Sequence, residues 1–246
     1  MIKPIKADPL VSVVIPTYNR SKLVKRAVTS VLDQTYEKLE LIVVDDGSTD
    51  NTEEAVNSFE DGRVQYIRHD KNKGGSDARN TGIRNSEGDL IALLDSDDEW
   101  LPRKMEEQIG LWRQCSGSVG LVYCPILVHD HQVKRIRNTN RELKEGYVYE
   151  DLLKGWTGPT TSSVTIKKEV FRLSGLFDEN FPSYQDYDLW VRIAKHYNFQ
   201  FVHENLVIYH SRRNSNDQIS YDFEARKKGT LLFLSKWGQE MQKIAG

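Results

Sequence analysis

Residues 90–100 have the sequence LIALLDSDDEW, in which five apolar residues pass directly into a run of acids. The apolar run is too short for an ordinary helix and follows Gly88-Asp89, so it predicts a strand buried on both faces, as in a parallel sheet. Residues 95–99, the acidic segment, then place four carboxylates within five residues. Their mutual repulsion is costly unless a cation or a positively charged ligand offsets it. The stretch alone fits either a metal site or a solvated acidic turn.

The residues before this stretch predict a doubly wound parallel sheet. Residues 11–16 and 39–44 are two more apolar runs of the buried type, and residues 64–67 form a shorter one. A helical pattern follows each of these three runs. Strands and helices that alternate in this way are typical of an α/β fold with parallel strands.

Polar residues follow three of these strands at the point where each strand ends. Thr17 and Tyr18 follow the first strand, Asp45-Asp46 end the second, and the acidic segment follows the fourth. In doubly wound sheets, ligands bind outside the carboxyl ends of the strands. The sequence therefore predicts a functional site at this edge of the sheet.

The second half of the chain has a less regular pattern. It predicts helices at residues 102–115, 147–155, 168–173 and 186–194, strands at 119–123, 163–166, 199–202 and 206–209, and an exposed hairpin at 129–146. The hairpin separates two halves, residues 10–115 and 116–220, of a single domain. Residues 221–246 carry apolar residues near helical spacing and predict a C-terminal amphipathic helix.

Composition excludes several classes of function. A chain of 246 residues with 38% hydrophobic residues can bury a proper core. Its net charge of −2 supplies no basic field for nucleic acid. Cys115 and Cys124 lie in no C-x-x-C motif, so we expect buried thiols and no disulfide framework or zinc site. The first residues have no apolar signal region and no run of 18 apolar residues occurs, so we expect a cytoplasmic protein without a membrane span.

The loops at the predicted edge exclude some ligands and favour another. Residues 16–20, PTYNR, contain none of the glycines that a dinucleotide fold or a nucleotidyltransferase places after the first strand. Val44 stands where a phosphatase loop would carry its nucleophile. By contrast, Tyr18 can stack on a base, an aspartate after the second strand can accept an imide N–H, and the acidic segment can bind a divalent ion. These features match a nucleoside diphosphate joined to a sugar.

Five stretches in this order resemble the family 2 glycosyltransferases with the GT-A fold. They span residues 11 to about 210 and are VVIPTYN at 13–19, VVDDGSTD at 43–50, ARN at 78–80, LDSDD at 94–98 and DYDLWVR at 186–192. The resemblance implies an inverting transfer of a hexose or hexosamine from a nucleotide sugar, usually a UDP-sugar, with Mg²⁺ or Mn²⁺. It also implies that residues 10–115 bind the nucleotide and that residues 116–220 bind the acceptor.

The resemblance assigns roles to named residues. Tyr18 and Asp46 are expected to contact the base. Asp95 is expected to contact the ribose or the sugar, and Asp95 and Asp97 are expected to bind the metal. Asp98 is left open, because the D-x-D motif of the family needs only two of the three acids. The donor-site residues that complete the set are Thr17, Ser96 and Arg79. For Arg79, a salt bridge to Asp45 or Asp77 is the alternative to contact with the base or a phosphate.

Inverting transfer needs a carboxylate that takes the proton from the acceptor hydroxyl as that hydroxyl attacks the sugar. Asp186 is our candidate for this base, with a helix N-cap as its structural alternative, and we expect Asp188 to be structural. The family more often has a glutamate before this aspartate, where this chain has Gln185. That difference puts in doubt any acceptor contact that a glutamate would make.

Several alternatives stay open at this point. The expected acceptor is a glycan or a lipid-linked molecule in the synthesis of a surface polysaccharide. The rival functions are a sugar-nucleotide binding module without catalysis and a metal-dependent nucleotidyltransferase. His203 and His210 could be structural, or could contact a metal or a phosphate. The terminal helix could pack on its own domain, on a second subunit, or on the inner face of the membrane.

Overall fold

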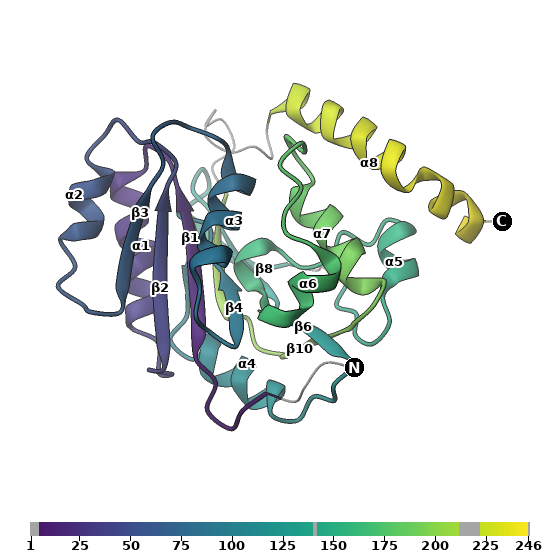
Figure 1. The fold of residues 1–246 in the computed structure, drawn as a ribbon, viewed down its shortest axis with the longest axis horizontal. Coiled ribbons are helices and arrows are strands. Elements are labelled where there is room, and N and C mark those ends of the chain that lie inside the picture. Colours follow the sequence, from purple (N-terminus) through teal and green to yellow (C-terminus); the bar gives the residue numbers. More distant parts are fainter. Residues whose placement is uncertain (1–4, 140–141, 212–221, 246) are drawn as a thin grey trace.

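The computed structural model describes residues 5–139, 142–211 and 222–245. A seven-stranded sheet forms its centre, with the strand order β10-β6-β9-β4-β1-β2-β3. These strands are β10 (Asn198–Phe201), β6 (Val119–Tyr123), β9 (Thr165–Lys167), β4 (Leu90–Leu93), β1 (Val11–Thr17), β2 (Leu39–Asp45) and β3 (Val64–Arg68). Helices lie on both sides of the sheet (Figure 1). The GT-A-like, doubly wound architecture expected from the sequence is confirmed.

The first half of the sheet follows the sequence pattern closely. β1 pairs in parallel with both β2 and β4, and every residue of β1 and β4 is buried. The connecting helices are α1 (Ser21–Leu32), α2 (Thr52–Asn57) and α3 (Gly75–Asn85). The pairing register sets Thr17 beside Asp45 and Val14 beside Leu93, so the loops after β1, β2 and β4 leave the sheet at one edge. The strand order reverses between β1 and β4, which is where such sheets bind ligands.

The second half adds strands that are only partly parallel. β9 lies between β4 and β6 and runs antiparallel to both. The further helices are α4 (Lys104–Trp112), α5 (Tyr149–Leu153), η1 (Thr161–Ser163), η2 (Lys168–Val170), α6 (Phe171–Ser174) and α7 (Gln185–Ala194). The helix predicted at 168–173 is therefore a 3₁₀ turn followed by one α-helical turn, and the strand predicted at 163–166 begins only at Thr165.

A second sheet packs behind the acidic segment, with the order β5-β11-β7-β8. Its strands are β5 (Glu99–Trp100), β11 (Val207–Ser211), β7 (Ile126–Asp130) and β8 (Arg135–Asn138). β7 and β8 form a hairpin that starts three residues earlier than expected and ends at Asn138. Only β8 is exposed as predicted, because β7 also pairs with β11 and is partly buried. β5 was not predicted: the last two residues of the quoted stretch, Glu99 and Trp100, pair with β11 and do not form a solvated turn.

The C-terminal helix α8 (Phe223–Ala245) packs on its own domain. Phe233 and Trp237 are buried in a core cluster that also contains residues of α5 and α7. On the outward side of α8, Leu231 and Leu234 are exposed. Among the described helices, none combines the length and apolar character needed to cross a membrane. The two cysteines are free thiols, Cys124 buried and Cys115 partly buried.

Two glycines in helices provide a test of this packing. A methyl group added to Gly82 in α3 would overlap the Val14 side chain on β1, whereas one added to Gly110 in α4 would meet no atom within 4 Å. We expect Gly82→Ala to lower the free energy of unfolding by about 1–3 kcal/mol through overpacking. Gly110→Ala should raise it by about 0.5–1 kcal/mol, because alanine loses less backbone entropy in a helix.

Urea denaturation of both variants measures this difference. In the Gly82→Ala background, Val14→Ala should recover part of the free energy of unfolding that is lost through the overlap. Equal effects of the two glycine substitutions would contradict the close contact of α3 with β1.

Candidate active site

The loops after β1 and β2 hold each other in place. Asn19 has a left-handed backbone with φ 51°, a conformation that asparagine tolerates better than most residues. Its N–H donates to Ser48 Oγ at 2.8 Å, and its Oδ1 accepts the N–H of Thr49 at 2.8 Å. The turn leaves the neighbouring Tyr18 42% exposed. That exposure suits the stacking role expected for Tyr18, which stays a prediction.

Asp46 is buried and organises the loop that precedes α3. Its Oδ1 accepts the N–H of Lys73 at 2.9 Å, and its Oδ2 accepts the N–H of Gly74 at 2.7 Å. His69 Nδ1 lies 2.8 Å from the same carboxylate. The expected contact of Asp46 with a base stays a prediction. His69 was missed at the sequence level, although it follows β3 directly and so lies at the predicted edge.

Arginines offset the charge of the acidic segment. Arg79 Nη2 lies 2.5 Å from Asp95 Oδ1, and Arg20 Nη1 lies 3.2 Å from Asp97 Oδ1. Arg26 Nη2 donates to the Asp97 carbonyl. The alternative partners suggested for Arg79, Asp45 and Asp77, are therefore wrong: its partner is Asp95. Arg20, the N-cap residue of α1, and Arg26, within α1, were missed because they lie more than 70 residues from the acidic segment in sequence.

Asp98 differs from its neighbours because it is 1% exposed and bonds inward. Its Oδ2 accepts from Ser162 Oγ at 2.5 Å, and its Oδ1 accepts the N–H of His210 at 3.1 Å. Burial, together with the charges of Asp97 and Asp95, raises the pKa of Asp98 well above its usual range. Asp98 thus ties the acidic segment to η1 and β11, whereas Asp95 and Asp97 pair with the arginines Arg79 and Arg20.

Asp186 lies in the first turn of α7, after the N-cap residue Tyr184, so the N-cap alternative for Asp186 is wrong. Its Oδ1 accepts the N–H of Tyr187 at 2.8 Å, and its Oδ2 accepts from Thr161 Oγ1 at 3.3 Å. Burial raises the pKa of Asp186, the positive charge of Arg79 lowers it, and the negative charge of Asp95 raises it again. The neighbouring residues Thr161 and Ser162 of η1 join Asp186 to the acidic segment, because Ser162 Oγ accepts the N–H of Asp95 at 3.1 Å.

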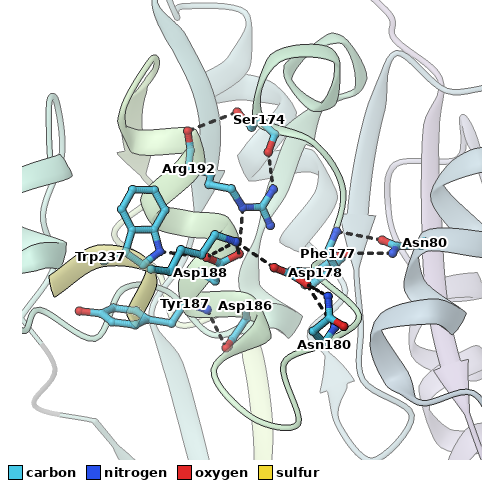
Figure 2. Close-up of polar contacts among 11 residues, drawn as sticks. Asn80, Ser174, Phe177, Asp178, Asn180, Asp186, Tyr187, Asp188, Arg192 and Trp237 are labelled. Carbon is cyan, nitrogen blue, oxygen red and sulfur yellow. Dashed lines mark hydrogen bonds and ion pairs between the residues drawn. The ribbon is translucent and has the colours of Figure 1, made fainter. Parts of the chain in front are cut away.

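Asp188 makes a separate set of contacts from those of Asp186, as Figure 2 shows. It is fully buried, and its carboxylate accepts from Arg192 Nε at 2.9 Å and Trp237 Nε1 at 2.9 Å. Lys236 Nζ lies 3.0 Å from the same group. The expectation that Asp188 is structural is confirmed.

Buried hydroxyl groups around the edge fit a polar ligand. Thr17 Oγ1, Ser76 Oγ and Thr160 Oγ1 are buried and have no hydrogen-bond partner among the described residues. They come from the end of β1, the start of α3 and the loop before η1. Because unpaired buried hydroxyls are costly, they favour a ligand that supplies donors and acceptors here.

Asp95 and Asp97 have the ligand chemistry that Mg²⁺ and Mn²⁺ prefer. Among the described residues, they belong to no group of three converging His, Cys, Asp or Glu ligands. Mg²⁺ is commonly held by one or two carboxylates together with the phosphates of a substrate. The residues present therefore fit an ion that binds jointly with a diphosphate.

Sequence comparison assigns the chain to a family. The family model described as glycosyl transferase family 2 matches residues 12–172. The chain belongs to glycosyl transferase family 2. A Rickettsia typhi protein named as an uncharacterised glycosyltransferase is 33% identical over 97% of this chain and 76% of its own. An Escherichia coli protein, WfgD, is 31% identical over 90% of this chain and 84% of its own, and is named as a UDP-Glc:α-D-GlcNAc-diphosphoundecaprenol β-1,3-glucosyltransferase.

Solved structures share the fold. S. aureus TarS in complex with UDP-GlcNAc matches with a TM-score of 0.70 and 16% identity, over 92% of this chain and 66% of that one. A Pyrobaculum calidifontis mannosyltransferase in complex with GDP-Man and Mn²⁺ matches with a TM-score of 0.66 and 22% identity, over 87% of this chain and 61% of that one. This family 2 chain thus spans less than two thirds of the length of the mannosyltransferase chain.

The charge environment of Asp186 can be measured directly by ¹³C NMR titration of the side-chain carboxyl groups, with Asp186→Asn to assign the signal. We expect the pKa of Asp186 to lie above the ordinary aspartate value of about 3.9, because burial favours the neutral acid. Asp95→Asn should lower this pKa by removing a negative neighbour. Arg79→Gln should raise it by removing a positive one.

Exposed Asp33, at the end of α1, supplies a matched control. Asp33→Asn should leave the titration of Asp186 unchanged. A pKa of Asp186 that did not respond to either Asp95→Asn or Arg79→Gln would separate Asp186 from the acidic segment.

Proposed function

We propose that this chain transfers a hexose or hexosamine from a UDP-sugar, with inversion, to a lipid-linked acceptor in the synthesis of a surface polysaccharide. The observation that carries the proposal is the half-buried carboxyl group of Asp186, whose pKa is raised and which interacts electrostatically with Arg79 and Asp95. A carboxyl group with a raised pKa is a better proton acceptor than an ordinary aspartate.

In the proposed reaction, the acceptor hydroxyl oxygen forms a bond to C1 of the donor sugar while the bond from C1 to the diphosphate oxygen breaks. Asp186 takes the hydroxyl proton, and the nucleoside diphosphate leaves from the opposite side. Thr161 and the first turn of α7 hold the Asp186 carboxylate in position through the hydrogen bonds described above. Asp95 and Asp97 would hold a divalent ion, which would supply positive charge to offset that of the leaving diphosphate.

The proposal of a UDP-sugar donor rests on the residues of the candidate site and on the similar proteins described above. We assign Tyr18, Thr17 and Asp46 to the binding of the base. Arg79, Ser96 and the carboxylates are assigned to the diphosphate and sugar. The name of WfgD gives a UDP-sugar donor, and the TarS structure contains UDP-GlcNAc. The mannosyltransferase structure contains GDP-Man with Mn²⁺. UDP is preferred here because WfgD is the more similar in sequence.

The lipid-linked acceptor is proposed from WfgD, whose name gives a diphosphoundecaprenol acceptor. The outward side of α8 supports contact with a membrane, since exposed Leu231 and Leu234 lie on a helix that also carries Lys227 and Lys228. Such a helix can lie at the surface of an anionic membrane. Contact through the same side with a second copy of the chain is the alternative.

Sedimentation with vesicles tests the membrane contact. We expect binding to vesicles that contain anionic lipid and at least a tenfold loss of binding in Leu231→Ser/Leu234→Ser, because these leucines would enter the lipid surface. If the wild type binds no vesicles but forms a dimer that the variant does not form, the result would favour contact with a second subunit.

Two substitutions separate donor binding from transfer. We expect calorimetry to show that Mn²⁺ tightens UDP binding at least tenfold. Asp97→Asn should abolish this effect of Mn²⁺, because the substitution removes a metal ligand. Asp186→Asn should keep metal-dependent UDP binding. It should lower the transfer rate by a factor of about 10²–10⁴, the usual contribution of a general base.

Asp33→Asn again serves as the control and should change neither measurement. A panel of nucleotide sugars, assayed for metal-dependent transfer and hydrolysis, identifies the donor. Metal-dependent binding without turnover of any donor would indicate a binding module. Unchanged turnover in Asp186→Asn would remove Asp186 from the mechanism.

A further inference from the structure

Three of the six histidines of the chain lie together on one face of the second sheet. His129 on β7 is directly opposite His210 on β11 in the pairing register, and His131 follows His129 by two residues. Because alternate residues of a strand point to the same side, the three rings share one face. We call His129, His131 and His210 the histidine cluster. It lies outside the set of residues proposed to bind the donor or to transfer the sugar.

The ring nitrogens of the histidine cluster converge. One ligand nitrogen from each ring lies within 4.8 Å of the other two. In the described part of the chain, this is the one group of at least three His, Cys, Asp or Glu residues with that property. His131 Nε2 and His210 Nδ1 are 2.8 Å apart, and the rings of His129 and His131 stack with centroids 4.3 Å apart. Nitrogen ligands of a tetrahedral ion are spaced by about 3.3 Å, given metal–nitrogen bonds of about 2.0–2.1 Å.

Glu99 sets the proton position on His210. Its Oε1 lies 3.1 Å from His210 Nε2, so the imidazole donates its Nε2–H to the carboxylate. The lone pair of His210 is then on Nδ1, where it accepts a hydrogen bond from His131 Nε2 that a bound metal ion would replace. A carboxylate that accepts from the far nitrogen of a histidine is the usual outer partner of a metal-bound imidazole. The same arrangement is therefore present here without any change of tautomer at His210.

We propose that the histidine cluster is a binding site for a divalent transition ion such as Zn²⁺, separate from the ion that accompanies the donor. Imidazole nitrogen suits Zn²⁺, Co²⁺ and Ni²⁺, whereas the oxygen ligands Asp95 and Asp97 suit Mg²⁺ and Mn²⁺. The ion joins the turn after β7 to β11. Through the contacts of His210 with Asp98 and Glu99, it also steadies the acidic segment from behind.

Cobalt provides a spectroscopic test on the full chain. Saturating Mg²⁺ first occupies the oxygen ligands, and Co²⁺ is then added while visible absorption is recorded. We expect one equivalent of Co²⁺ to bind with the visible absorption of a four-coordinate site in which three of the ligands are histidine nitrogens, and Zn²⁺ to displace it. His131→Ala should weaken Co²⁺ binding at least tenfold and abolish this absorption. His131 follows β7 at a turn and supports no core packing, and thermal unfolding of the variant checks that it folds.

Two further variants make the outcome decisive. His203→Ala removes an exposed histidine outside the cluster and should leave Co²⁺ binding unchanged. Asp97→Asn should also keep the absorption band, because the proposed site does not use that carboxylate. Absence of the band in the wild type, its persistence in His131→Ala, or its loss in Asp97→Asn would each overturn the proposal. Because sugar transfer is not measured, failure of the enzymatic proposal would leave this result intact.

Discussion

The burial of one carboxylate, Asp98, inside a run of four is the constraint on which much of this structure depends. A buried charge is costly without hydrogen-bond donors, and here the donors come from Ser162 and from the backbone of His210. These two residues belong to η1 and β11, far from Asp98 in sequence. To supply them, the chain must bring both elements behind β4, and the short strand β5 then pairs with β11. The second sheet is thus built around the end of the central strand.

The same constraint divides the acidic segment by function. With Asp98 directed inward, Asp95 and Asp97 face the carboxyl edge, where Arg79 and Arg20 offset their charge. From the acidic stretch alone, a bound cation or a solvated turn was expected to balance this charge, but the chain supplies its own cations. Guanidinium groups also bind phosphate oxygens well. In the proposed reaction, a diphosphate and its ion can therefore exchange partners with these ion pairs while the local charge stays balanced.

Local pattern was enough to predict the strands β1, β2 and β4, because each is a continuous apolar run and its buried state follows from composition alone. It was also enough to locate the edge where Thr17, Asp46 and the acids gather. β5 could not be predicted in the same way, since two residues carry no periodicity and their pairing depends on β11. The ion pairs of Arg20 and Arg79, and the meeting of His131 with His210, likewise depend on tertiary contacts between distant segments.

Helix α7 links the proposed chemistry to the end of the chain. Asp186 and Asp188 are two residues apart, so a helix directs them to nearly opposite sides. One reaches the site, and the other accepts from Trp237 and Lys236 of α8. α8 also approaches closely, since a side chain at Gly229 would come within 2.6 Å of the Ser183 carbonyl, just before α7. The inward side of α8 therefore fixes the helix that carries the proposed base. A membrane or a second subunit bound to its outward side would press on that same helix, which would couple the location of the acceptor to the position of Asp186.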